Sequence, residues 1–514
     1  MAKREVTSLR AAVEAFREAG ELLVTDVEVD PDLEVAGIQK ALDNGPAILF
    51  ENLKGYPEKR FGINFFTDDR RLCHLFDAGD VRELKARIRE GFRKPIPPRE
   101  VEDAPCQEVV ITRDINAWEI LPMISHTSKD PGRTFGGGIS TVVGKYFQGG
   151  SHIGFNRMSF LPDRRDYASF QISPGSHMWQ IATRYYRKEP IPLTMCAGVP
   201  PAVYMVAGSG FNYLALPEGG DEIGLAGAIQ GSPVEIVKAR TVDAYALAQA
   251  EFVLEGYLDT SERVWETPQS EQEQRQGVYP FHPEWAGYMG RAYRTYRFQV
   301  TGVTYRKDRP IYYNPIVHGY DDHNINSKVR EASFIDLAER ICPGLVVDAH
   351  IPLGMTDWGG VIYQVRKRNR FDEGYQRNIL TATIPFSQGM RLAIAVDEDI
   401  DIYSAEDVLW ALTTRVEADQ DILTVAPGGR GQTFQPAERA AAAPGREWVS
   451  HETRYGGGIA IDATVPFQFK DFFERPVYPL DVVGDLRKWV SEEELAWARS
   501  QQNDYARSMA RSGI

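Results

Sequence analysis

The chain has 514 residues and a formal net charge of −14. This length accommodates two or three domains with hydrophobic cores of their own, so neither disulfides nor a structural metal is needed for stability. The acidic balance disfavours nucleic acid as a general partner. The four cysteines are scattered without a CxxC pair, and no apolar segment approaches the roughly 20 residues of a membrane helix or forms a signal peptide. We therefore expect a cytoplasmic protein that does not enter a membrane.

The first part of the chain predicts an α/β domain over residues 1–113. The segment SLRAAVEAFREAG has the period of an amphipathic helix, ELLVTDVEV follows it as a strand, and PAILF is apolar throughout, as a buried strand would be. Residues 89–106, REGFRKPIPPREVEDAPC, are rich in proline and charge and have no clear period. We interpret them as a linker into the next unit.

Residues 114–310 contain many short apolar runs separated by glycine and proline, which predicts a strand-rich domain built as an open or split barrel. The runs interpreted as strands are GGGISTVVG, YFQGGSHIGF, VYMVAGSG, EFVLEGYL and YRFQVTGVTYR. The α/β alternation then returns over residues 311–480, and residues 481–514 form a helical tail that begins with a capping box, Ser491 with Glu494. The predicted fold class is thus α/β with a central split β-barrel.

Three candidate metal ligands lie in the strand-rich section: His152, His177 and Glu222. Two imidazoles and a carboxylate suit iron, manganese or zinc better than calcium. Each residue also has a simpler interpretation. His152 could face water from a strand, His177 could be a turn residue, and Glu222 could be a solvated residue of the turn PEGGDE.

Several blocks of the sequence resemble, in order, the UbiD family of decarboxylases, which use prenylated flavin mononucleotide (prenylated FMN). The blocks include HIGFNR, SHMWQI, IPLTMCAGVPPA, DEIGLAGAIQGSPVEIVKART, EFVLEGYL, PEWAGY, VDEDIDIYSAEDVLWALTTR and GIAIDAT. The resemblance implies a three-part architecture whose split barrel binds the flavin. It also implies an asparagine, a histidine and a glutamate around a divalent metal that grips the flavin phosphate, often beside K⁺, with an arginine and two acidic residues at the reaction site.

Carried over by position, the resemblance assigns cofactor binding to His152, Arg157, His177 and Glu222, with the two histidines and Glu222 as metal ligands. His152 stands where the family usually has asparagine. This replacement gives the site a second imidazole, which should shift its metal preference toward Fe²⁺ relative to Mn²⁺. The odd spacing puts His152 and Arg157 on opposite faces of a regular strand. Either the first meets the metal and the second the ring, or a bulge intervenes.

The acidic pair of the family is matched only in part. Glu284 fits the second acid, but Tyr279 stands where the first, the usual proton donor, is expected. The resemblance assigns catalysis to Arg157 and Glu284, and Tyr279 is a candidate donor if its pKa is lowered. His282 could replace it, as could Glu271 or Glu273. Alternatively, Tyr279 and His282 only shape the pocket, with Met158, Phe160, Phe281 and Trp285 as further apolar wall residues.

The implied activity is reversible decarboxylation of an aromatic or conjugated acid, with a flavin prenyltransferase supplying the cofactor and a homodimer or homohexamer as the assembly. A coenzyme A thioester such as phthaloyl-coenzyme A is one possible substrate, because the basic run VRKRNR at residues 365–370 could meet a nucleotide phosphate. Two rival interpretations stay open. One is an Fe²⁺ oxygenase with His152, His177 and Glu222 as a facial triad. The other is a non-catalytic subunit of a carboxylase complex.

Overall fold

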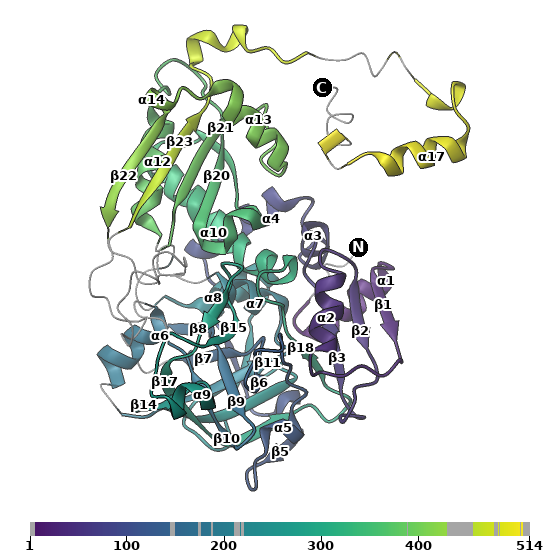
Figure 1. Cartoon of the computed structure of the whole chain (residues 1–514), viewed down its shortest axis with the longest axis vertical. Coiled ribbons are helices and arrows are strands. Elements are labelled where there is room, and N and C mark those ends of the chain that lie inside the picture. The colour runs from purple at the N-terminus through teal and green to yellow at the C-terminus, as the bar shows by residue number, and fades with distance from the viewer. Residues whose placement is uncertain are drawn as a thin grey trace.

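The computed structural model describes residues 6–143, 150–172, 176–186, 189–209, 216, 220–387, 389–428, 456–476, 482, 484–503 and 505–506. Its N-terminal part is a four-stranded sheet in the order β1-β2-β3-β18, with α1, α2 and α3 beside it (Figure 1). Ser8 caps α1, and every residue of β2 is buried. The predicted helix and strands are confirmed. These elements are α1 (Leu9–Glu18), β1 (Leu22–Thr25), α2 (Glu34–Ala41), β2 (Ala47–Phe50), β3 (Arg60–Ile63), α3 (Asp69–Leu75), α4 (Val81–Arg93) and β18 (Ile311–Tyr313).

The predicted linker is more ordered than its composition indicated. Its first residues complete α4, and the short strand β4 (Arg99–Val101) pairs in parallel with β12 (Glu235–Lys238). β12 also pairs with β13 (Tyr245–Leu247), so the three strands form a small separate sheet. Edge strands of three residues satisfy few hydrogen bonds and carry little periodic signal, which explains why the sequence pattern did not reveal β4.

The central sheet confirms the predicted split barrel. It has nine strands in the order β6-β9-β10-β17-β14-β11-β7-β8, with β5 paired to β17. The long pair β14–β17 is antiparallel and shifts register twice, and such bulges bend strands and let a sheet curl (Figure 1). The strands are β5 (Val109–Ile111), β6 (Arg133–Thr134), β7 (Ile139–Val143), β8 (Ser151–Phe155), β9 (Met158–Leu161), β10 (Arg164–Phe170), β11 (Ile191–Ala197), β14 (Phe252–Trp265) and β17 (Arg294–Tyr305).

One predicted strand is wrong: most of VYMVAGSG lies in a helix, α7 (Pro201–Gly208), which begins with proline at its first position. All eight residues of α7 are buried, so its apolar residues do not follow a helical period. α7 packs against α8 (Glu222–Gln230) and α10 (Tyr320–Ile341), and α8 and α10 both contact α4. These helices join the barrel to the two α/β parts.

The C-terminal part is a five-stranded sheet in the order β19-β20-β21-β23-β22, and it confirms the predicted α/β alternation. α10 and α12 cover one hydrophobic core, whereas α13 covers a second core. Beyond this sheet the capping box of Ser491 and Glu494 starts α17 (Glu492–Gln501), which lies apart from the sheets in Figure 1. The other elements are β19 (Val346–His350), β20 (Gly360–Val365), α12 (Tyr375–Phe386), β21 (Leu392–Asp397), α13 (Ala405–Arg415), α14 (Ala418–Asp421), β22 (Ile422–Gly428) and β23 (Gly456–Ala463).

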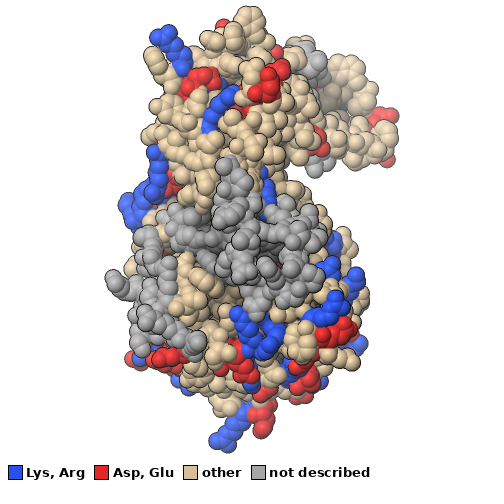
Figure 2. All heavy atoms as spheres, turned by 60° about the vertical axis from the view of Figure 1, so that its left-hand side comes forward, with Lys and Arg blue, Asp and Glu red and all other residues tan. Residues whose placement is uncertain are grey.

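A buried ion network fixes the C-terminal sheet against the N-terminal helices. The Lys85 ammonium on α4 lies 2.6 Å from Asp348 on β19 and 3.3 Å from Glu331 on α10. Lys85, Glu331 and Asp348 are all buried, so their charges are not hydrated by water and are stabilised by pairing with one another. Acidic and basic side chains are interspersed over the face shown in Figure 2. Within the described ranges, none of the helices has both the length and the apolar character that crossing a membrane requires.

Candidate active site

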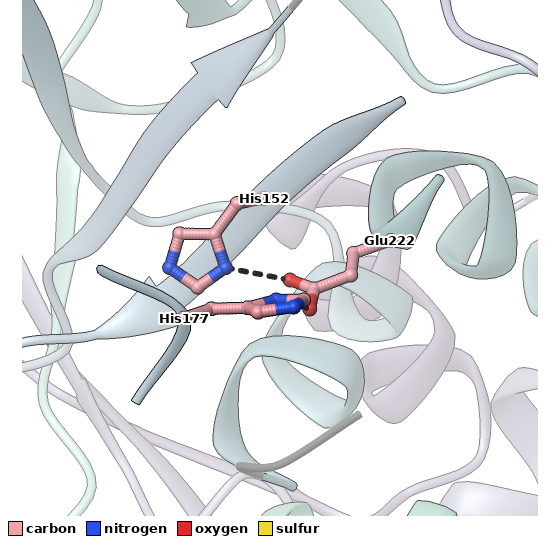
Figure 3. Close-up of side chains that lie close together, drawn as sticks. All are labelled: His152, His177 and Glu222. Carbon is pink, nitrogen blue, oxygen red and sulfur yellow. Dashed lines mark hydrogen bonds and ion pairs between the residues drawn. The ribbon is translucent and has the colours of Figure 1, made fainter. Parts of the chain in front are cut away.

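His152, His177 and Glu222 come together from three separate elements (Figure 3). His152 lies on β8, His177 is the first residue of the short helix α6 (His177–Gln180), and Glu222 is the first residue of α8. Their potential ligand atoms all lie within 4.8 Å of one another, and all three side chains are buried. The solvent-facing interpretations of His152 and Glu222 are therefore wrong, His177 begins a helix rather than lying in a turn, and the predicted metal ligands form a cluster.

Hydrogen bonds already orient this cluster. The Nδ1 atom of His152 lies 3.0 Å from one Glu222 oxygen, and that of His177 lies 2.8 Å from the other (Figure 3). The backbone N–H of Ile153 donates to the same carboxylate at 2.8 Å. Burial alone would raise the pKa of Glu222, but the two imidazoles outweigh it and hold the pKa at about 2. Glu222 is thus ionised at neutral pH, as a metal ligand must be.

Local packing explains why a turn-like sequence buries a glutamate. Asp221 caps α8 by accepting from the Gly224 N–H, and Ser151 on β8 donates to Asp221 at 2.5 Å. The Ser151 hydroxyl in turn accepts from the Ile223 N–H at 2.8 Å. These bonds dock the first turn of α8 onto β8, directly beside His152. The glutamate therefore points into the protein rather than into water.

Arg157 lies in a different environment from His152, although only five residues separate them. β8 ends at Phe155 and β9 begins at Met158, so Arg157 belongs to the connection between two strands. Its guanidinium donates to Glu284 at 2.7 Å and to Glu266 at 3.0 Å, and it lies 4.7 Å from the centre of the Phe281 ring. Burial alone would lower the pKa of Arg157, but the two carboxylates raise it above its ordinary value. The arginine is therefore a buried cation held between two acids.

Glu266 is a residue of this site that sequence reasoning missed. It directly follows β14, it is buried, and its second oxygen accepts from the backbone N–H of Tyr293 at 2.9 Å. Burial raises its pKa, and this effect exceeds the opposing effect of Arg157. Its position after the long strand was the available signal, because the family places its acidic pair beyond that strand. The structure thus supplies a second carboxylate to Arg157.

Tyr279 does not lie with this group. Its hydroxyl donates to Glu273, and this hydrogen bond raises the pKa of Tyr279, opposite to the direction that a proton donor requires. Glu271 forms an ion pair with Arg164. The structure therefore does not bring Tyr279, Glu271 or Glu273 to Arg157.

A cavity of about 220 Å³ opens beside Arg157. Arg157 and Glu284 contribute to its wall from the barrel, and Asp322 and Trp358 from the C-terminal part. Of the apolar wall residues expected from the sequence, Trp285 lines the cavity, whereas Met158 and Phe160 belong to the hydrophobic core. The further lining residues are His126, Thr134, Phe135, Gly136, Gly137, Gly138, Phe155, Asn156, Gln171, Gly208, His282, Pro283, Asn314, Pro315, Val317, Asn326 and Asp357.

Most basic side chains of the run VRKRNR form ion pairs with acidic residues of the C-terminal part. Arg366 pairs with Glu398 and Arg368 pairs with Asp372. Lys367 is buried and donates to Glu373 at 3.1 Å and to the Val465 carbonyl at 2.7 Å. Paired charges attract a phosphate less strongly than free ones, so this pairing argues against the expected phosphate site.

Three family models match the chain in sequence. They are described as the N-terminal, Rift-related and C-terminal domains of 3-octaprenyl-4-hydroxybenzoate carboxy-lyase (UbiD), and they match residues 13–88, 99–320 and 323–463. Gallate decarboxylase from Lactiplantibacillus plantarum is 31% identical over 488 residues, which cover 91% of this chain and 95% of that protein.

Solved structures agree with these matches. The apo 3,4-dihydroxybenzoic acid decarboxylase from Enterobacter cloacae is 27% identical with a TM-score of 0.80, covering 96% of this chain and 100% of that chain. The UbiD-class enzyme HmfF from Pelotomaculum thermopropionicum, solved in complex with FMN, is 25% identical with a TM-score of 0.80, covering 94% and 100%. An evolved dimeric form of HmfF, solved with prenylated FMN, shares the fold at 24% identity and a TM-score of 0.77, with coverage of 94% and 100%. The chain therefore belongs to the UbiD family of carboxy-lyases.

Proposed function

We propose that this carboxy-lyase removes CO₂ reversibly, without oxidation, from an aromatic or conjugated acid, using prenylated FMN and a divalent metal. The observation that carries the proposal is the triad Glu266–Arg157–Glu284 at the cavity. Arg157 follows His152, one of the three clustered candidate ligands, by five residues. A buried cation held by two acids is suited to receive a substrate carboxylate in a fixed orientation.

The residues present fit the metal that the family implies. His152, His177 and Glu222 offer two imidazoles and an ionised carboxylate, all buried and converging. This donor set suits Fe²⁺ and Mn²⁺, and the second histidine favours Fe²⁺. We propose that these residues hold the metal at the cofactor phosphate, with K⁺ beside it as in the family. When bound, prenylated FMN supplies the electron sink for the carbanion that loss of CO₂ leaves behind.

The protein side chains divide the remaining work. Arg157 binds the substrate carboxylate, and Glu266 fixes the guanidinium because its other oxygen is held by the Tyr293 backbone. Glu284 lines the cavity and lies 2.7 Å from Arg157, so we propose that its carboxylate takes up a proton from solvent and then delivers it to the carbon that CO₂ leaves. The bond between the ring and the carboxyl carbon breaks, CO₂ leaves, and the proton from Glu284 completes the product. In this scheme Tyr279 has no role as donor.

The rival interpretations lose the observations that motivated them. A non-catalytic subunit was suggested by the missing acid at position 279, and Glu266 now provides a second carboxylate at Arg157. An Fe²⁺ oxygenase rested on the ligand trio alone, which a UbiD-family enzyme also accounts for. All four cysteines are free and buried, which supports our placement of the protein in a reducing cytoplasm.

We also propose that the chain forms a homodimer or homohexamer through its C-terminal part. Large apolar side chains are exposed there: Phe472 is 83% exposed, Trp489 65% and Trp497 66%. Several exposed aromatic side chains in one part of a protein indicate an interaction surface more often than a surface that faces only water.

The decisive experiment is purification after co-expression with a flavin prenyltransferase. We expect prenylated FMN and about one divalent metal per chain by mass spectrometry and metal analysis, and CO₂ release from at least one aromatic acid. A flavin-free, oxygen-consuming protein would favour the oxygenase instead. A flavin-loaded protein that releases no CO₂ from a broad panel of acids would favour the non-catalytic subunit.

The state of the substrate needs a separate assay with paired compounds. Free phthalate and other aromatic acids should be compared with their coenzyme A thioesters, phthaloyl-coenzyme A included. We expect turnover of the free acid, because Arg366, Lys367 and Arg368 are already paired with protein acids. Turnover of the thioester alone would contradict this expectation and would place the nucleotide on another surface.

A further inference from the structure

His282 occupies a strained position at the edge of the cavity. It lies on β15 (Pro280–Pro283), which pairs with β16 (Met289–Arg291), and the register of this pair shifts between Phe281 and Pro283. The φ angle of His282 is 33°, a backbone conformation that costs energy for any residue with a side chain. A bulge of this kind redirects a side chain. Here it places the His282 imidazole in the cavity wall, close to Arg157 and Glu284.

The imidazole of His282 is held in one orientation. Its Nδ1 atom lies 2.7 Å from the Pro283 carbonyl oxygen, and because a carbonyl only accepts, Nδ1 carries the proton. The ring of His126 packs edge-on against it, with 4.4 Å between ring centres. His126 is itself fixed, since its Nε2 accepts from Asn314 at 3.1 Å and its Nδ1 lies 3.4 Å from Asp130.

The remaining nitrogen of His282 is unused by the protein. Nε2 is buried and has no hydrogen-bond partner among the residues that the structure describes, although the side chain lines the cavity. Burial, together with His126 and Arg157, keeps the pKa of His282 well below its ordinary value. The neutral ring therefore presents a lone pair at Nε2. Nε2 is thus an acceptor rather than a proton donor in this state.

We propose that His282 Nε2 accepts a hydrogen bond from a donor group on the substrate ring, and so selects aromatic acids that carry a phenolic hydroxyl or a ring N–H. The inference rests on the proposed function for the placement of the substrate carboxylate at Arg157. With the carboxylate there, a donor elsewhere on the ring can meet His282, which shares the cavity. A buried acceptor left without a partner costs free energy, so rings that lack the donor are rejected.

The test compares ring pairs of similar shape that differ in the donor: para-hydroxybenzoate with para-fluorobenzoate, and pyrrole carboxylate with furan carboxylate. Binding to the holoenzyme is measured by calorimetry, and kcat and KM are measured where CO₂ is released. For one of the two pairs, we expect the wild type to prefer the donor-bearing ring about tenfold or more, the effect of one buried hydrogen bond. The pair that shows the preference identifies the donor as hydroxyl or N–H.

Three variants assign the preference to His282. H282F keeps a flat ring but removes the acceptor, and the preference should fall to about one. H282Q retains an acceptor oxygen near the former Nε2, and it should keep part of the preference. H74Q, at an exposed histidine of α3, is the matched control and should behave as wild type. H282L replaces H282F if the latter does not fold, as judged from its melting temperature.

The outcomes separate this inference from the proposed function. An unchanged preference in H282F, or equal binding of both members of each pair by the wild type, overturns the role of His282, even if CO₂ is released. A binding preference that disappears in H282F supports the role of His282, even if no acid is decarboxylated and the proposed function fails.

Discussion

Replacing Arg157 with lysine should reduce kcat/KM for decarboxylation at least ~100-fold, the loss expected when a reacting group is misplaced by about an ångström. Lysine keeps the positive charge, but it cannot donate to Glu266 and Glu284 through two arms of one planar group while still facing a substrate carboxylate. The cofactor and metal content of R157K should stay unchanged, because Arg157 is not one of the three clustered ligands. Steady-state kinetics together with flavin and metal analysis measure both quantities.

The matched control is R297K, in the same barrel sheet. Arg297 pairs with Glu262, and both side chains are partly exposed, at 28% and 49%. Exposed pairs contribute about 0–1 kcal/mol, so R297K should match wild type in activity and stability. Full activity of R157K would show that a point charge suffices at this position, and the carboxylate-orienting role of Arg157 would be wrong.

Replacing Glu222 with glutamine should abolish metal binding and, with it, retention of the flavin. Glutamine has the same shape but lacks the charge. Its amide N–H₂ would also face a histidine that now donates to a carboxylate oxygen. Loss of an outer hydrogen-bond partner already costs roughly 10- to 100-fold in metal affinity, so loss of a ligand should cost more. Metal analysis and the visible flavin spectrum of purified E222Q, beside the exposed-site control E262Q, measure the effect.

The pH dependence of stability provides an independent test on metal-free protein. The folded-state pKa of Glu222 is about 2, against 4.5 for a free glutamate. Its carboxylate therefore stabilises the fold fully above about pH 4.5, and this contribution is lost as the pH falls toward 2. The difference in melting temperature between wild type and E222Q should be largest near neutral pH and shrink below pH 4.5. A difference that stays constant down to pH 3 would contradict the hydrogen-bonded carboxylate.

The sequence predicted the architecture well because its strongest signals are local. The amphipathic helix α1 and the buried strand β2 follow from periodicity and apolar composition. α7 was predicted wrongly because a helix buried on every side has no polar face to reveal its period. Pro201 at its first position was the one local sign of a helix start.

The site was predictable in part for a different reason. His152, His177 and Glu222 are distant in the sequence, so their residue types made them only candidate ligands, and the resemblance to a family gave the reason to place them at one metal. Glu266 follows the long strand that the resemblance pointed to, but it was missed because β14 runs for 14 residues with two register shifts and the sequence does not mark where it ends. The orientation of His282 depends on a bulge and a positive φ angle, which no local pattern of residue types specifies.

The two hydrogen bonds from the histidines to Glu222 have a consequence for how a cation enters the protein. Side chains that are free in solution lose rotational entropy when an ion gathers them, and that loss weakens binding. Here Glu222 already holds both imidazoles in place, so a cation that replaces these two hydrogen bonds meets ligands that lie close together. Uptake should therefore leave the surrounding backbone almost unmoved.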